Sequence, residues 1–106
     1  MSLWAVRGCR MSRDKKRRVV RLNYAHGLHA RPATFIVQEL SKFDARIYLL
    51  KDNRCVNAKS VIELLTLGAM DGERLAIEAE GADADKAVER LAWLLECGLR
   101  EQFQEK

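Results

Sequence analysis

Alternating apolar and polar positions predict short strands along most of the chain. The clearest alternation places Leu75, Ile77 and Ala79 on one side of a strand and residues such as Glu78 on the other side, which we expect to meet water. Asp52-Asn53 suits a tight turn between two neighbouring strands. The predicted strands cover residues 20–22, 45–50, 54–58 and 74–80.

Three segments follow the helical period instead. In residues 30–41 the apolar positions recur at i, i+3, i+4 and i+7, and Pro32 is tolerable because it lies in the first turn. A short second helix is bounded by Ser60 and Glu63, which have the S-x-x-E spacing of a capping box, and by Gly68 as a stop. A third begins after Asp83, a candidate N-cap. Its stripe consists of Ala84, Ala87, Val88, Leu91 and Leu95.

The resulting element order is β-α-β-β-α-β-α, which predicts an α+β fold. Strands with one apolar face and helices with one apolar stripe bury both when the helices cover one face of an antiparallel sheet. A chain of 106 residues with 48% hydrophobic residues fits one such domain. We predict a domain over residues 17–100, preceded by an extension over 1–16 and followed by a tail over 101–106.

The ends of the chain bear on location and partners. No apolar run approaches the ~18 residues of a membrane helix, which predicts no membrane insertion. The apolar run within residues 1–9 is shorter than the ~7–15 residues of a signal-peptide core, so we expect a cytoplasmic protein. Basic residues concentrate in residues 10–21, but no aromatic residue interleaves with them, which favours a solvated extension over a nucleic-acid-binding arm.

Candidate chemistry concentrates at Gly27-Leu28-His29-Ala30-Arg31-Pro32-Ala33. Here a histidine stands at a helix start, where the amides of Ala30 and Arg31 have no intrahelical partner and the helix end carries partial positive charge. Such an end binds phosphate, and the Arg31 guanidinium can hold two phosphate oxygens. Neutral imidazole is nucleophilic near pH 7, so His29 is a candidate for carrying a transferable phosphoryl group. A histidine that merely caps a helix is the structural alternative.

This segment resembles the active-site signature of the HPr phosphocarriers of the bacterial phosphoenolpyruvate-dependent phosphotransferase system. The resemblance covers roughly residues 17–100 and includes three further segments. These are Ala58-Lys59-Ser60-Val61, Leu67-Gly68 and Ala79-Glu80-Gly81-Ala82-Asp83.

The resemblance implies an open-faced β-sandwich of four strands and three helices. It implies that His29 takes phosphate on Nδ1 from phosphorylated enzyme I and gives it to IIA proteins or domains for sugar uptake, with Arg31 as the active-site arginine. Ser60 matches the family's regulatory serine, which in some bacteria is phosphorylated by a dedicated kinase, and capping of the short helix is compatible with that role. On this interpretation the chain is a carrier rather than an enzyme, with no cofactor.

Several alternatives stay open at this stage. The same carrier chemistry serves a regulatory branch, of the nitrogen or catabolite-repression type, without sugar transport. Val61, Leu64 and Leu65 cannot all face the core of so short a helix, and we expect Val61 and Leu64 to contribute to partner docking. His26 and His29 have a spacing that metal sites use, but no cysteine or carboxylate nearby in sequence completes a site, so we expect no metal.

Overall fold

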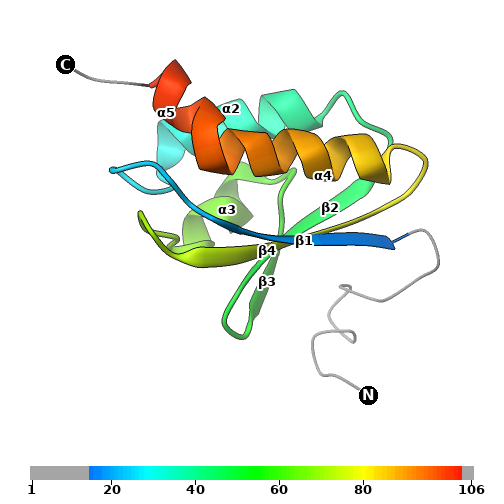
Figure 1. The fold of residues 1–106 in the computed structure, drawn as a ribbon, viewed down its shortest axis with the longest axis horizontal. Helices are drawn as coiled ribbons and strands as arrows, with labels where there is room; N and C mark the ends of the chain where they lie inside the picture. Colours follow the sequence, from blue (N-terminus) through cyan, green and yellow to red (C-terminus); the bar gives the residue numbers. More distant parts are fainter. Residues whose placement is uncertain (1–14, 104–106) are drawn as a thin grey trace.

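The computed structural model describes residues 15–103 and contains a four-stranded antiparallel sheet with helices on one face (Figure 1). The strands are β1 (Lys15–Arg21), β2 (Arg46–Lys51), β3 (Arg54–Asn57) and β4 (Arg74–Glu80), in the spatial order β1-β4-β2-β3. The helices are α2 (Ala30–Leu40), α3 (Val61–Leu67) and a C-terminal run of α4 (Ala84–Trp93), the π-helical turn η1 (Leu94–Gly98) and α5 (Leu99–Gln102). The predicted α+β open-faced sandwich is confirmed.

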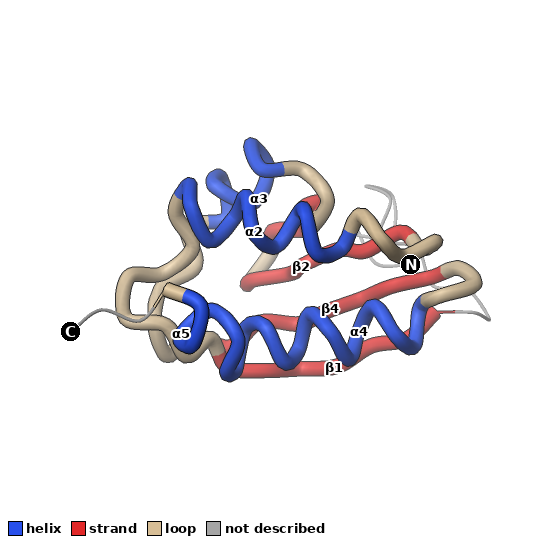
Figure 2. The backbone as a smooth tube through the Cα atoms, turned by 90° about the horizontal axis from the view of Figure 1, so that it is seen from above, coloured by secondary structure: helices blue, strands red, loops and turns tan. Residues whose placement is uncertain are grey.

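The core lies between the sheet and the helices. Leu49 and Ile77 oppose each other across β2 and β4 and are fully buried. From above, α4 lies along β1 and β4, while α2 lies on the side of β2 (Figure 2). The predicted stripe of the last helix is buried throughout, because it faces this sheet.

The elements extend past the limits predicted for the domain. β1 begins at Lys15, before the predicted start at residue 17, since its pairing with β4 continues to Lys15 opposite Glu80. The helical run continues to Gln102, beyond the predicted end at residue 100 and into the predicted tail. The remainder of the predicted extension, residues 1–14, lies outside the described residues.

The prediction that the polar strand faces meet water is wrong at Glu78. This residue is fully buried on β4. Its carboxylate pairs with two β1 side chains, Lys15, whose Nζ lies 2.6 Å from Oε1, and Arg17. A carboxylate loses its hydration on burial, and the two neighbouring cations compensate for that loss.

The predicted helix caps form in part. Ser60 is the N-cap of α3 and its Oγ accepts a hydrogen bond from the Glu63 amide at 3.3 Å. The reciprocal half of the capping box is absent, because the Glu63 carboxylate accepts from the Asn57 amide instead, at 2.8 Å. Gly68 ends α3 with φ of 67°, as predicted. Asp83 is the N-cap of α4, but its carboxylate accepts from the Asp44 amide, at 2.7 Å.

Candidate functional site

The loop before α2 is held by backbone contacts that only glycine permits. Gly27 has φ of +71°, and a Cβ at this position would lie 2.8 Å from the Ala69 carbonyl oxygen. The same carbonyl accepts a hydrogen bond from the Leu28 amide at 3.0 Å. Leu28 is buried and fixes the loop in place. His29, the next residue, therefore lies at the start of α2.

His29 is the N-cap of α2, with extended backbone angles, and its carbonyl accepts from the Ala33 amide at 2.9 Å. Its imidazole is exposed and makes no capping hydrogen bond to the helix. His29 therefore occupies the capping position of α2, as the structural alternative expects, but it does so through its backbone, and its side chain takes no part in the cap. The helix is positioned by the backbone of His29, which leaves the ring accessible to another molecule.

The start of α2 presents unpaired donors beside this ring. The amides of Ala30 and Arg31 occupy the first two helical positions and donate to no acceptor among residues 15–103. Both residues are exposed. α2 has no acidic residue in its first turn to compete for these donors or for the positive helix end. Donors arranged in this way next to an imidazole are chemically suited to an anion.

The rings of Tyr24 and His26 lie near the ring of His29. Its ring centroid lies 6.3 Å from that of Tyr24 and 6.3 Å from that of His26, and the two histidine rings meet edge to face. Tyr24 is buried, and its amide donates to the Asp71 carboxylate at 3.0 Å. Residues 15–103 contain no group of three or more histidine, cysteine or acidic side chains placed to hold a metal ion.

The segment after α3 supports the loop from the other side. Glu73 accepts a hydrogen bond from the Met70 amide at 2.7 Å and lies 2.9 Å from Lys51 Nζ. The contact with Lys51, with a contribution from the Met70 amide, holds the pKa of the Glu73 carboxyl below its usual value of 4.5. Glu73 therefore stays charged near neutral pH and fastens the turn next to Ala69, whose carbonyl receives Leu28.

The surface of α3 differs from the prediction. Leu64 is fully buried among the core residues, so its predicted docking role is wrong, since no partner can reach its side chain. Val61 is half-buried against the core. The exposed apolar side chains of this region are Ile62, Leu65 and Met70. Met70 adjoins the loop before α2, with its Sδ 3.5 Å from the position of a Cβ at Gly27.

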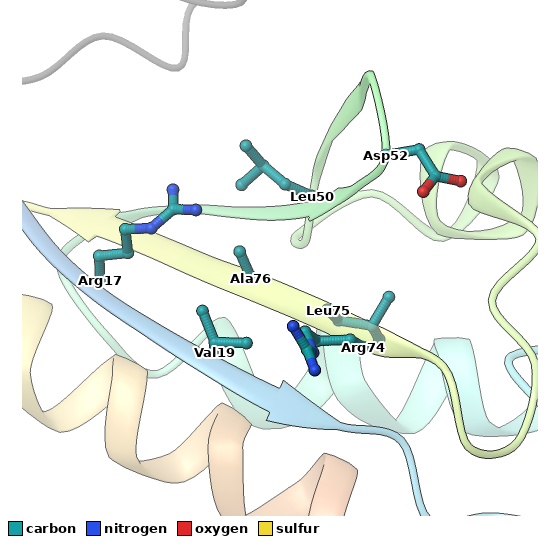
Figure 3. Close-up of a pocket in the computed structure, with 7 residues that line it drawn as sticks. All are labelled: Arg17, Val19, Leu50, Asp52, Arg74, Leu75 and Ala76. Carbon is teal, nitrogen blue, oxygen red and sulfur yellow. The ribbon is translucent and has the colours of Figure 1, made fainter.

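Two hollows lie in the surface of residues 15–103. One of about 570 Å³ lies on the open face of the sheet, where Arg17 and Val19 of β1 face Ala76 of β4 (Figure 3). Another of about 390 Å³ lies beside His26, between Asp71 and Arg100. His29 lines neither of these two hollows.

Two contacts of this site have no counterpart in the sequence analysis. Phe103, in the predicted tail, packs against Tyr24 and Phe35, and the guanidinium carbon of Arg31 lies 5.5 Å from the centre of its ring. The carbonyl of Ala69 holds the loop from a distant part of the chain. The apolar character of Phe103 was the one available signal, since a large aromatic residue in a tail favours a packed position.

The described part of the basic segment is largely engaged within the molecule. Lys15 and Arg17 pair with Glu78, Lys16 lies 3.6 Å from Asp85, and Arg21 donates to the Gly72 carbonyl at 2.7 Å. Among residues 15–103, no helix combines the length and apolar character needed to cross a bilayer.

Comparison with known proteins agrees with the geometry. The family model PTS-HPr, described as "PTS HPr component phosphorylation site", matches residues 16–96. The phosphocarrier protein HPr of Buchnera aphidicola from Acyrthosiphon pisum is 40% identical over 76 residues, covering 72% of this chain and 89% of that protein. The HPr-like protein Crh of Bacillus subtilis is 42% identical over 66 residues, covering 62% of this chain and 78% of its own. A crystal structure of HPr from Bacillus anthracis superposes with a TM-score of 0.74 at 38% identity, covering 76% of this chain and 96% of that one. The chain therefore belongs to the HPr family of phosphocarrier proteins of the phosphotransferase system.

Proposed function

We propose that this chain accepts a phosphoryl group on Nδ1 of His29 from phosphorylated enzyme I and passes it to IIA proteins or domains for sugar uptake. The observation that carries the proposal is the exposed imidazole of His29 beside the unpaired amides of Ala30 and Arg31. The expected partners are proteins, and the expected location is the cytoplasm.

The transfer follows from this arrangement. The lone pair on Nδ1 of neutral His29 attacks phosphorus, a P–N bond forms, and the bond from phosphorus to the donor breaks with its electron pair leaving on the donor group. Nε2 keeps its proton. The amides of Ala30 and Arg31 and the Arg31 guanidinium stabilise the charge spread over the phosphoryl oxygens. A nucleophile of the IIA protein then attacks the same phosphorus and returns the electron pair to Nδ1.

An intact-mass measurement tests this step. The protein is incubated with phosphoenolpyruvate, magnesium and enzyme I, then measured at neutral pH and after acid treatment. We expect an acid-labile gain of one phosphate that His29→Ala abolishes. His26→Ala is the matched control, because it removes the neighbouring exposed imidazole and should leave the gain unchanged. Phosphate acceptance by His29→Ala would contradict the assignment.

Partner docking is proposed for the exposed apolar side chains of α3 and the following turn, namely Ile62, Leu65 and Met70. Ile62 is the most exposed, at 76%, and such a side chain on a small protein fits a transient apolar contact. Ile62→Ser should raise the KM for phosphorylated enzyme I with little change in kcat. Val19→Ser is the control, because Val19 is also exposed but lies on the open face of the sheet. Equal effects of the two substitutions would contradict this surface.

Regulatory phosphorylation of Ser60 by an HPr kinase/phosphorylase is a second proposal. Ser60 is half-buried and begins α3, a helix end where added negative charge is tolerated. With ATP and the kinase we expect an acid-stable phosphate that Ser60→Ala removes, while Ser41→Ala, at the end of α2, retains it. An acid-stable phosphate that persists in Ser60→Ala would contradict the site.

The alternative function is the same carriage in a regulatory branch without sugar transport. Similarity to both HPr and Crh favours neither branch. The discriminating measurement supplies the phosphorylated protein with sugar-specific IIA proteins and, separately, with a nitrogen-type IIA protein. Transfer to the sugar-specific proteins supports the uptake role, and transfer to the nitrogen-type protein alone supports the alternative.

A further inference from the structure

The end of the C-terminal helical run lies against the residues proposed to bind phosphate. Figures 1 and 2 place α5 at the end of the molecule where α2 begins. Phe103, directly after α5, packs edge to face on Phe35 of α2, with ring centroids 5.6 Å apart, and lies 6.2 Å from the ring of Tyr24. The family model ends at residue 96, so this contact lies beyond the matched segment.

Phe103 also meets the one side-chain cation of the motif. The guanidinium carbon of Arg31 lies 5.5 Å from the centre of the Phe103 ring, within the range of a cation–π interaction. Arg31 is exposed and takes part in none of the ion pairs formed among residues 15–103. Within residues 15–103, the contact of this guanidinium is therefore with the Phe103 ring.

A ring restrains Arg31 differently from a carboxylate. A carboxylate would occupy the N–H groups that phosphate needs and would oppose its charge, whereas an aromatic face attracts the cation without accepting those N–H groups. Ordering a long arginine side chain costs conformational entropy, and a side chain ordered before the reaction avoids that cost at the moment of transfer.

We infer that Phe103 is a positioning residue for phosphoryl transfer, which acts through Arg31 by holding its guanidinium against the Phe103 ring with its N–H groups free for phosphate. This inference rests on the proposed function of His29. It predicts that removal of the ring slows transfer without removing the phosphate acceptor.

The test is the single-turnover rate of transfer from phosphorylated enzyme I. Phe103→Leu keeps an apolar side chain and removes the ring, and should slow transfer about two- to fivefold, the range of an exposed cation–π contact. Phe103→Tyr keeps an aromatic ring at this position and should transfer at the wild-type rate. In an Arg31→Ala background, Phe103→Leu should have no further effect.

Trp93→Leu is the matched control. Trp93 lies in the same C-terminal helical run, and the guanidinium carbon of Arg90 lies 4.8 Å from its ring. The Trp93→Leu variant therefore loses the same kind of contact, but with Arg90 and not with Arg31. Transfer by Trp93→Leu should be unchanged. The Arg31 Nε–H resonance gives a readout independent of transfer, because removing the Phe103 ring should shift it and removing the Trp93 ring should not.

Two results would overturn the inference. One is a Phe103→Leu protein that transfers at the wild-type rate or keeps the Arg31 resonance unshifted. The other is a Phe103→Leu substitution that slows transfer equally in the wild-type background and in the Arg31→Ala background. That result would mean that Phe103 acts only by stabilising the fold. A wild-type protein that accepts no phosphate at all would instead refute the proposed function, so the two failures are distinguishable.

Discussion

Gly27 offers a sharp test of how the active-site loop is held. Gly27→Ala places a Cβ at φ of +71° and within 2.8 Å of the Ala69 carbonyl oxygen. The left-handed backbone costs about 1–2 kcal/mol for a residue with a Cβ. The close approach forces the carbonyl away and weakens its bond with the Leu28 amide, which costs about 0.5–1.5 kcal/mol more. We therefore expect a total loss of about 1.5–3.5 kcal/mol in the free energy of unfolding.

Gly68 separates these two contributions. It has φ of +67°, nearly the same backbone conformation, but a Cβ there meets nothing within 4 Å. Gly68→Ala should therefore cost only the conformational part, about 1–2 kcal/mol. Urea unfolding followed by circular dichroism measures both variants, and equal m-values make the midpoints comparable.

A local measurement accompanies the global one. Hydrogen exchange at the Leu28 amide should accelerate in Gly27→Ala relative to amides of the core, because its acceptor is displaced. In Gly68→Ala, the exchange rate of the Leu28 amide relative to amides of the core should be the same as in the wild type. Equal stability losses in the two variants, with no change at Leu28, would refute the contribution of the close approach.

Three further predictions concern α3 and the helix surface. Leu64→Ala should lower the free energy of unfolding by about 2–5 kcal/mol, because it opens a cavity, whereas Leu65→Ala should change it by no more than about 0.5 kcal/mol. Urea unfolding measures both variants, and similar losses would contradict the difference in burial between the two leucines. Ser60→Ala should lower stability by about 0.5–1 kcal/mol through loss of the cap, and a thermal midpoint equal to that of the wild type would show that the 3.3 Å contact contributes nothing. The hydrogen bond from Arg90 holds the pKa of Glu39 below 4.5, so this pair stabilises the fold above that pH and the contribution disappears as pH falls through the lowered pKa. Glu39→Gln should cost about 0.2–1 kcal/mol near pH 7 and nothing at pH 2, and an equal cost at both values would contradict the ion-pair origin.

Much of the site was predictable because its chemistry is local. An amide donor at a helix start lacks a partner wherever the helix begins, so Ala30 and Arg31 could be assigned from the motif around Pro32. The same holds for Gly68, whose role as a helix stop depends on its own backbone angle. Periodicity likewise located the core-facing residues of the strands and long helices, since each pattern extends over several residues.

The remainder depended on packing between distant segments. In a helix of seven residues, periodicity did not decide which leucine faces inward, so Leu64, which is buried, was assigned to docking. Nothing near Glu78 in sequence indicated that strand pairing would bring Lys15 and Arg17 to it. Such contacts depend on the sheet order β1-β4-β2-β3, which periodicity alone does not determine.

The C-terminal helical run explains why Phe103 escaped prediction. A π-helical turn contains an extra residue relative to the α-helix, so the residues after the turn are rotated by about 100° from the stripe that the sequence predicts. η1 supplies this change between α4 and α5, and Gly98 lets the Trp93 ring pack against this turn, since a Cβ there would lie 2.5 Å from the ring. Phe103 consequently reaches Tyr24, Phe35 and Arg31 instead of ending as a solvated tail.

The contacts around His29 share a feature that suits a reversible carrier. Its neighbours are fixed through groups that phosphate does not need: the Leu28 amide binds a carbonyl, the His29 carbonyl starts the helix, and an aromatic ring contacts Arg31. The imidazole and the first amides of α2 are thereby left exposed and unpaired. Donors that are already oriented need little rearrangement when charge develops on the phosphoryl group. Under the proposed function, an open site lets two different partners approach the same phosphorus in turn, which an enclosed pocket would prevent.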